Sequence, residues 1–249
     1  MKNLNHIRKA LRSLCIAVIL FTTVFLSGCN DKEEAPAPLE TGTVTDIEGN
    51  VYQTVKIGGK WWMAENLRVT HFRNGISIRV GQDSADWVLP LSAYCVFENN
   101  AAAPGLLYNG FAVDDSSGLA PEGWHIPTDN EWQELERSLG MSSDAANTLG
   151  WRGSNEGSKM KKKSPDGWIR YGEVWSTNES GFTALAGSCR LQNATFGSPG
   201  LQATGFWWAS SGWGPDESYY RYLDYKNDNI FRSHVLKNYG LSIRCVRDN

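Results

Sequence analysis

Cysteine is the residue type of this chain most able to do chemistry, and Cys29 has the most informative surroundings. A basic start that includes Arg8 and Lys9 precedes an uncharged apolar run from Leu14 to Leu26, and Leu-Ser-Gly-Cys then ends at Cys29. This order is typical of a secretory signal that ends in a lipobox, where the cysteine thiol receives the lipid. The run is shorter than the about 20 apolar residues that a membrane-spanning helix needs. We therefore expect residues 1–28 to be a signal peptide and Cys29 to carry lipid, palmitate included.

Three further cysteines, Cys95, Cys189 and Cys245, lie in the chain that would remain after cleavage. Three thiols in an oxidising envelope suggest one disulfide and one cysteine left over. No two of them form a Cys-x-x-Cys pair, which argues against a thioredoxin-like redox site and against a zinc knuckle.

Other residue types that perform catalysis are scattered. His71, His125 and His234 have no histidine partner at helical spacing, and the chain has neither a Gly-x-Ser-x-Gly elbow nor a phosphate-binding glycine loop. His125 stands just ahead of a predicted helix, where a general base and a hydrogen-bonded structural histidine are both conceivable, and the position favours the structural role. We expect no catalytic residue and no enzyme activity.

Oxygen ligands for calcium occur together in one segment that contains Asp224 and residues 227–229. Their spacing is not that of an EF-hand, and an ordinary turn rich in Asn and Asp is the favoured reading. We expect neither a metal site nor a cofactor.

Tryptophan is the most informative residue type for binding, since the chain contains 11. Rings that the core does not need would offer flat faces to sugar CH groups or to a protein partner. Trp207 and Trp208 alternate in a predicted strand, so one should face outward, and Trp213 lies in a glycine-rich loop. Trp208 and Trp213 are the candidate ligand-binding residues, with packing in the core as an equally weighted alternative. For Trp62, Trp124 and Trp132 the core is favoured.

Charge excludes one class of partner. The formal net charge is −3, and the one basic cluster, Lys159 with residues 161–163, lies among small polar residues. Nucleic-acid binding needs a clustered positive surface, so we expect no nucleic-acid partner.

The elements that must position these residues begin after a tether. Residues 29–41 are polar and proline-containing, and residues 42–249 are long enough for a single domain with its own core. Thr43 to Ile47, Val51 to Ile57 and Lys60 to Ala64 read as a three-stranded meander, because glycines at the turns supply positive φ angles. Trp61 and Trp62 should then point to opposite faces of the third strand.

A helix is predicted after Pro127, with Thr128 and Glu131 as a capping box, and a weaker one from Ser143 to Leu149. Gly150 to Asp166 reads as turns. Later strands are expected at Ala186 to Leu191, Phe206 to Ser210, Tyr219 to Tyr225, Ile230 to Leu236 and Leu241 to Val246. This order indicates an α+β domain, with small antiparallel sheets, one or two helices and long loops.

Several segments together resemble the Fibrobacter succinogenes major paralogous domain. They are Thr45 to Leu67, Ala93 to Cys95, Gly105 to Asn109, Leu119 to Thr128, Asn178 to Phe182 and Ile243 to Asp248. The resemblance covers nearly all of residues 42–248. That family is abundant in surface lipoproteins of Bacteroidetes, and two of its motifs are similar to the formylglycine-generating-enzyme fold, itself related to C-type lectins.

The resemblance implies an irregular lectin-like architecture and a disulfide between Cys95 and Cys245, with Cys189 free. The reactive cysteine pair of the formylglycine-generating enzymes has no counterpart in the terminal segment, where Cys245 stands alone. A lysine and two acids after Cys29 also resemble an export signal of Bacteroidetes lipoproteins, with a plain soluble linker as the alternative.

We expect a lipoprotein anchored in the outer membrane and facing the cell exterior. Its function is expected to be non-enzymatic binding or adhesion to a glycan or an envelope protein. A structural role in a surface or fimbrial assembly is the alternative, and a divergent enzyme of the formylglycine-generating type is the third choice.

Overall fold

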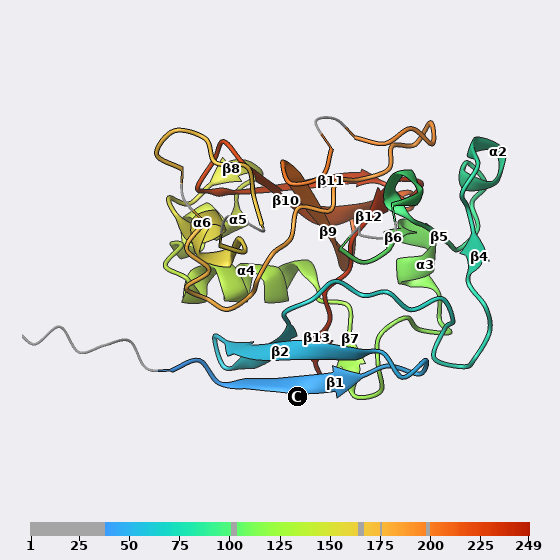
Figure 1. Cartoon of the computed structure of the whole chain (residues 1–249), viewed down its shortest axis with the longest axis horizontal. Coiled ribbons are helices and arrows are strands. Elements are labelled where there is room, and N and C mark those ends of the chain that lie inside the picture. The colour runs from blue at the N-terminus through green and yellow to red at the C-terminus, as the bar shows by residue number, and fades with distance from the viewer. Residues whose placement is uncertain (1–37, 101–103, 164–166, 175, 198–199) are drawn as a thin grey trace, which may run out of the picture. The chain divides into compact units, whose positions relative to one another are not determined.

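The computed structural model describes residues 38–100, 104–163, 167–174, 176–197 and 200–249. Its contacts divide the chain into Met1–Pro38 and Leu39–Asn249, and the second unit holds every described helix and strand. Three small sheets and five mostly short α-helices make up this unit (Figure 1). The fold class is therefore α+β, as predicted. Cys29 and the signal peptide lie outside the described residues.

The first sheet, here called the meander sheet, has the order β1-β2-β3-β13-β7. Its strands are Thr41–Thr45 (β1), Val51–Ile57 (β2), Lys60–Met63 (β3), Val246–Arg247 (β13) and Trp124–His125 (β7). The predicted meander is thus confirmed, with Gly58 and Gly59 at positive φ in the turn between β2 and β3. Two short segments complete the sheet, β7 from the middle of the chain and β13 from its C-terminal end, because β13 pairs with both β3 and β7.

The second sheet, here called the aromatic sheet, has the order β8-β11-β10-β9. Its strands are Gly150–Arg152 (β8), Ile230–Leu236 (β11), Glu217–Asp224 (β10) and Thr204–Gly212 (β9). Residues 226–229 form the tip between β10 and β11, as predicted. The interpretation of residues 150–166 as turns was wrong in part, since this segment contains β8 and the helix Glu156–Met160 (α6).

The third sheet has the order β12-β6-β5-β4, with strands Gly240–Leu241 (β12), Leu107–Asn109 (β6), Ala93–Cys95 (β5) and Arg79–Val80 (β4). Its β4–β5 pair is parallel, unlike all the other strand pairs described. Short helices flank it at Ser84–Trp87 (α2) and Gly110–Asp114 (α3), with a 3-10 turn at Phe97–Asn99 (η1). The strand expected at Ala186 to Leu191 is replaced by isolated bridges.

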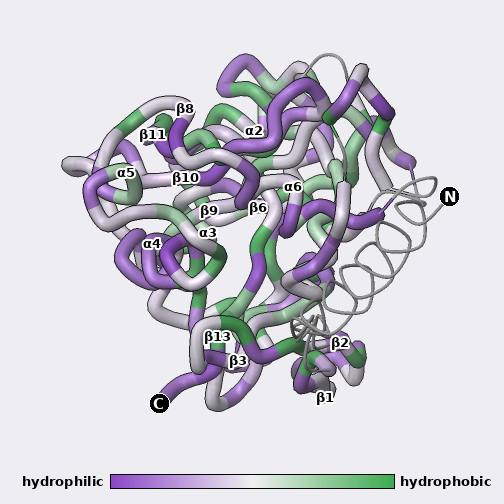
Figure 2. Tube along the Cα trace, turned by 90° about the vertical axis from the view of Figure 1, so that its left-hand side faces the viewer, coloured by the Kyte–Doolittle hydropathy of each residue, from purple (hydrophilic) through white to green (hydrophobic). Residues whose placement is uncertain are grey.

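Helix Asp129–Ser138 (α4) contains the predicted capping box of Thr128 and Glu131, and the shorter Ser143–Asn147 (α5) follows it. Figure 2 shows that α4 is largely hydrophilic in sequence, although it lies against the core. Its buried acids explain this contrast. Asp129 accepts hydrogen bonds from Arg221 at 2.8 Å and Arg232 at 2.7 Å, and Glu136 accepts from Arg152 and Arg221. Buried charges are tolerated when they are paired in this way.

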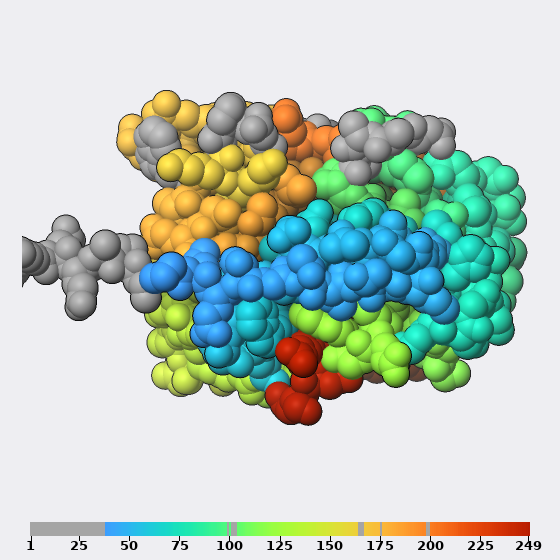
Figure 3. Space-filling view, turned by 60° about the horizontal axis from the view of Figure 1, so that its bottom comes forward, coloured from blue at the N-terminus to red at the C-terminus, as the bar shows by residue number. Residues whose placement is uncertain are grey.

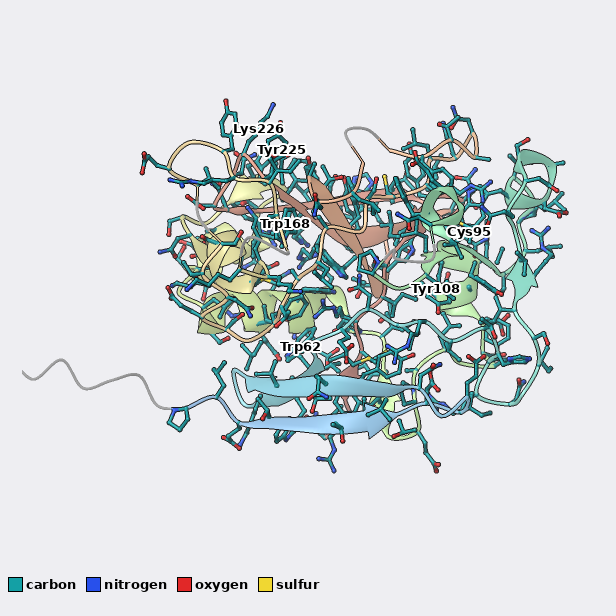
Figure 4. The ribbon with its side chains drawn as sticks, viewed as in Figure 1. Trp62, Cys95, Tyr108, Trp168, Tyr225 and Lys226 are labelled. Atoms are coloured by element: carbon teal, nitrogen blue, oxygen red, sulfur yellow. The ribbon has the colours of Figure 1, made fainter. Side chains whose placement is uncertain are left out.

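Aromatic residues fill much of the core. Trp62 lies between the meander sheet and α4, with its ring centroid 5.2 Å from that of Trp132 and 6.1 Å from that of Phe182 (Figure 4). A second cluster gathers around Tyr52, Tyr108 and Trp208. In the part of the chain that the structure describes, no helix is both long and apolar enough to cross a bilayer.

Candidate functional site

One groove is lined by residues from all five strands of the meander sheet. It has a volume of about 350 Å³ and contains Gly42 and Thr43 of β1, Thr54 of β2, Trp61 of β3, Arg247 of β13 and Trp124 of β7, with Glu122 and Gly123 beside them. Strands β1 and β7 are the two edges of the sheet, yet both line the same groove, so the sheet curves around it. Figure 3 shows this side of the unit, where β1 (blue), residues 119–125 (lime green) and the C-terminal residues (red) lie together.

Two tryptophans are among the residues that line the groove. Trp61 is half-buried and lies on the face of β3 opposite Trp62, as the alternation of strand residues requires. Trp124 is 7% exposed. Within the described residues, neither indole N–H has a hydrogen-bond partner, whereas the indole of Trp208 donates to the Tyr108 carbonyl at 2.8 Å. Trp124 thus packs mainly in the core, as predicted, and Trp61 is the tryptophan that presents more ring surface to the groove.

Charged and hydroxyl groups complete the lining. Arg247 and Glu122 are exposed, and neither side chain forms an ion pair with any residue that the structure describes. The hydroxyls of Thr43 and Thr54 likewise make no hydrogen bond to the described part of the chain. An exposed cation and an exposed carboxylate thus line the groove together with two tryptophans and two threonines, and pockets with a few convergent polar groups are typical ligand sites.

A second depression of about 250 Å³ continues the groove past Glu122. Thr45, Asp46 and Ile47 form one wall, and Arg73 with residues 119–122 forms the other. Arg73 donates to the carbonyl oxygens of Ala120 at 3.0 Å and Trp124 at 3.2 Å, which fixes the loop that carries the groove wall.

Asp46 is less available to a ligand than its place in this depression suggests. Its carboxylate accepts the Tyr52 hydroxyl at 2.6 Å and the backbone N–H groups of Glu48 and Asn50, both at 2.9 Å. The protein itself therefore engages Asp46, whereas the side chains of Glu122 and Arg247 in the groove are exposed.

His125 follows Trp124 in β7 and is held at both ring nitrogens. Its Nδ1 lies 2.6 Å from Asp248 and its Nε2 lies 2.9 Å from Glu131, the same acid that closes the capping box of α4. Burial raises the pKa of Glu131, but hydrogen bonds from Thr128 and His125 more than offset this, so that its pKa is lowered. This geometry agrees with the structural role favoured for His125.

The two tryptophans singled out from the sequence lie apart from this groove. The expectation that Trp207 or Trp208 faces outward was wrong, since both are completely buried. Trp208 offers no ring face to a ligand, because it packs in the cluster around Tyr108 and Cys245. Trp213 is 46% exposed in the loop between β9 and β10, and one of its faces is covered by His234, whose ring is parallel at 4.6 Å.

The disulfide implied by the family resemblance is not formed. Cys95, Cys189 and Cys245 are all free and buried. Cys95 (Figure 4) belongs to a cluster with Trp87 and Phe97, whereas Cys245 packs in the cluster with Tyr52 and Met63, so the two thiols lie in different clusters of the core.

The segment considered for calcium forms a turn. The Asp224 carboxylate accepts the backbone N–H of Lys226 at 2.6 Å and the Tyr222 hydroxyl at 2.6 Å. Among the described residues, no group of three or more potential metal ligands comes together.

Sequence reasoning missed Trp61, Glu122, Trp124 and Arg247 as a group. Each lies in a segment that carries the family resemblance, but nothing in the sequence shows that β1, β7 and β13 meet in one sheet. The pairing of β13 with β3 and β7 brings these segments together.

A family model described as the Fibrobacter succinogenes major domain matches residues 55–247. The chain belongs to this family. Of the groove residues, Trp61, Glu122, Trp124 and Arg247 fall inside the matched region of this Fibrobacter succinogenes major domain. Neither a curated protein nor a solved structure matches the chain. The lectin-like architecture implied by the motifs stays a prediction.

Proposed function

We propose that this member of the Fibrobacter succinogenes major domain family is a non-enzymatic binding module that holds a glycan in the groove of the meander sheet. One observation carries the proposal. Trp61 and Trp124 bound a groove of about 350 Å³ into which the unpaired Arg247 and Glu122 also project. Aromatic faces suit the CH faces of sugars, and the charged groups suit their hydroxyls.

The proposal extends to the place of the protein in the cell. A signal peptide of residues 1–28 and a lipidated Cys29 would anchor the chain in the outer membrane, with residues 29–41 as a tether and the domain facing the exterior. A glycan site on such a domain would act in adhesion.

A glycan-array screen of the purified protein tests the proposal. The screen is then repeated by fluorescence titration with the best-bound oligosaccharide. Arg247→Ala and Glu122→Gln change exposed side chains that form no hydrogen bond or ion pair with any residue that the structure describes, so both variants should fold and should bind at least tenfold more weakly. Trp61→Ala should abolish measurable binding.

Trp151→Ala is the matched control, because Trp151 is 39% exposed but lies on the aromatic sheet. Its affinity should equal that of the wild type. Failure of every glycan to bind, or equal loss in the Trp151 variant and in the groove variants, would contradict the glycan proposal.

A role in surface assembly is the second candidate, and a different surface favours it. Ile76, Val80, Val88, Leu89 and Leu91 are each 42–59% exposed within one short stretch around β4 and α2. Exposed aliphatic groups of this kind mark protein interfaces. Crosslinking on intact cells, compared between the wild type and Leu89→Ser/Leu91→Ser, would reveal a protein partner that depends on this stretch.

A further inference from the structure

Another pocket lies at the aromatic sheet and shares no residue with the groove or with the depression beside it. It has a volume of about 240 Å³ and is formed between the aromatic sheet and segment 189–197 (Figure 1, orange). Its walls are Cys189, Leu191, Gly197, Phe206, Tyr220, Val235, Tyr239 and Leu241. Phe206 and Tyr220 project from the face of this sheet opposite Trp207 and Arg221, which face α4.

The pocket is uncharged at neutral pH. None of its lining residues is an acid, a lysine, an arginine or a histidine. Burial raises the pKa of the Cys189 thiol to about 12, although a backbone hydrogen bond from Gly197 partly offsets this, and burial also raises the pKa of Tyr220 to about 12. A charged ligand would lose its hydration here and gain no counter-charge.

Two phenol hydroxyls supply the polar character of the pocket. Neither Tyr220 nor Tyr239 makes a side-chain hydrogen bond to any residue in the described part of the chain, and both rings are half-buried. Each hydroxyl can donate to an acceptor on a molecule that enters the pocket. Unused donors beside apolar walls favour a ligand with a ring and a single acceptor.

Aromatic rings continue from the pocket across the sheet. Phe206 stacks on Tyr222 at 4.5 Å and 13°, Tyr222 contacts Phe231 at 5.9 Å, and Phe231 contacts Trp151 at 5.3 Å. One residue from each of the four strands thus contributes to a row that joins the half-buried Phe206 in the pocket wall to the exposed Trp151.

We infer that this pocket is a second binding site, selective for an uncharged ligand of one or two apolar rings that carries a hydrogen-bond acceptor. The volume agrees with this class, because an apolar cavity of about 150 Å³ already binds benzene and drug-sized ligands need about 300 Å³ or more. The site is independent of the glycan groove.

Fluorescence titration of the full chain with 2-acetylnaphthalene tests the inference, since this probe has two fused rings and one carbonyl acceptor. Saturable binding with one site is expected, whereas the anion 2-naphthoate should bind at least tenfold more weakly. Tyr220→Phe and Tyr239→Phe should each weaken 2-acetylnaphthalene binding about three- to tenfold. Both should leave the binding of 2-ethylnaphthalene, which has no acceptor, unchanged.

Val235→Phe places a larger side chain in the pocket and should abolish binding of both neutral probes. Val88→Phe is its matched control, because Val88 is exposed outside the pocket. Trp61→Ala should keep full affinity for the naphthalene probes, which separates this site from the groove. No saturable binding of 2-acetylnaphthalene, equal binding of 2-naphthoate, or unchanged binding in the Val235 variant would overturn the inference.

Discussion

Asp129 shows at the scale of one residue how this core accommodates charge. Burial raises the pKa of its carboxyl group, but hydrogen bonds and charge from Arg232 and Arg221 outweigh burial and lower that pKa to about 2. Because the folded pKa lies below the usual value near 4, the carboxylate stabilises the fold above that pH, and the contribution disappears as the pH falls towards 2. It amounts to about 2 to 3 kcal/mol.

Asp129→Asn should therefore lower the free energy of unfolding at pH 7 by about 3 to 5 kcal/mol, since it leaves Arg221 and Arg232 without their carboxylate. Denaturant unfolding between pH 7 and pH 2 measures both effects. Between pH 4 and pH 2 the free energy of unfolding should fall less steeply in the variant than in the wild type. Asp144→Asn, an exposed acid of α5, is the control. Equal pH profiles for the wild type and the Asp129 variant would contradict the assigned role.

The three thiols give a second prediction at this scale. Burial raises the pKa of Cys95 to about 11 and that of Cys189 to about 12, and it also raises that of Cys245. Since the thiolate is the reactive form, iodoacetamide at pH 8 should leave all three unmodified in the folded protein. In denaturant without reductant, peptide mapping should find all three alkylated. A Cys95–Cys245 disulfide in that mapping would restore the pairing implied by the family.

The tryptophans show what could and could not be predicted from the sequence. Alternation correctly placed Trp61 and Trp62, and likewise Trp207 and Trp208, on opposite faces of their strands, but the conclusion that Trp207 or Trp208 is exposed was wrong. Alternation tells which face of a sheet a residue occupies and not whether a loop covers that face. In the aromatic sheet, Trp208 is covered on its outer side by residues around Tyr108 and Leu241, which come from other parts of the chain.

At the scale of elements, the hairpin between β2 and β3 links the meander sheet to α4. A Cβ atom at Gly58 would lie 2.8 Å from the Cβ of Ser138, whereas one at Gly59 would meet nothing within 4 Å. Both residues have positive φ. Gly59→Ala should cost about 1 kcal/mol of unfolding free energy.

Gly58→Ala should cost about 2 to 4 kcal/mol, because a steric clash adds to the same conformational cost. Thermal or denaturant unfolding of the two variants compares them directly. Similar losses in both would mean that the turn does not press against α4.

Elements with local signals were predictable. The meander, the capped helix after Pro127 and strand Ile230–Leu236 follow from glycine turns, a capping box and alternation. The strand expected at Ala186 to Leu191 was wrong, because this segment pairs with other segments only through isolated bridges at Ser188 and Arg190. The groove could not be predicted from the sequence either. Strands β13 and β7 contain two residues each, so only their pairing with neighbouring strands identifies them.

At the scale of the whole molecule, the proposed lipid anchor at Cys29 would determine where binding takes place. Cys29→Ala should move the protein from the membrane fraction to the soluble fraction of cells, because the lipid would have no attachment site. Immunoblotting of fractionated cells measures this, and Cys189→Ala should leave the distribution unchanged. Full membrane retention of the Cys29 variant would contradict the lipoprotein proposal.

The groove is the central claim, and the indole N–H signals of a ¹⁵N-labelled protein test it most directly. During titration with the oligosaccharide selected by the array, the signals of Trp61 and Trp124 should shift together along one saturation curve. Those of Trp151, Trp208 and Trp213 should stay in place, since these residues lie outside the groove. Shifts at Trp213 or Trp151 without shifts at Trp61 and Trp124 would contradict a glycan site in the meander sheet.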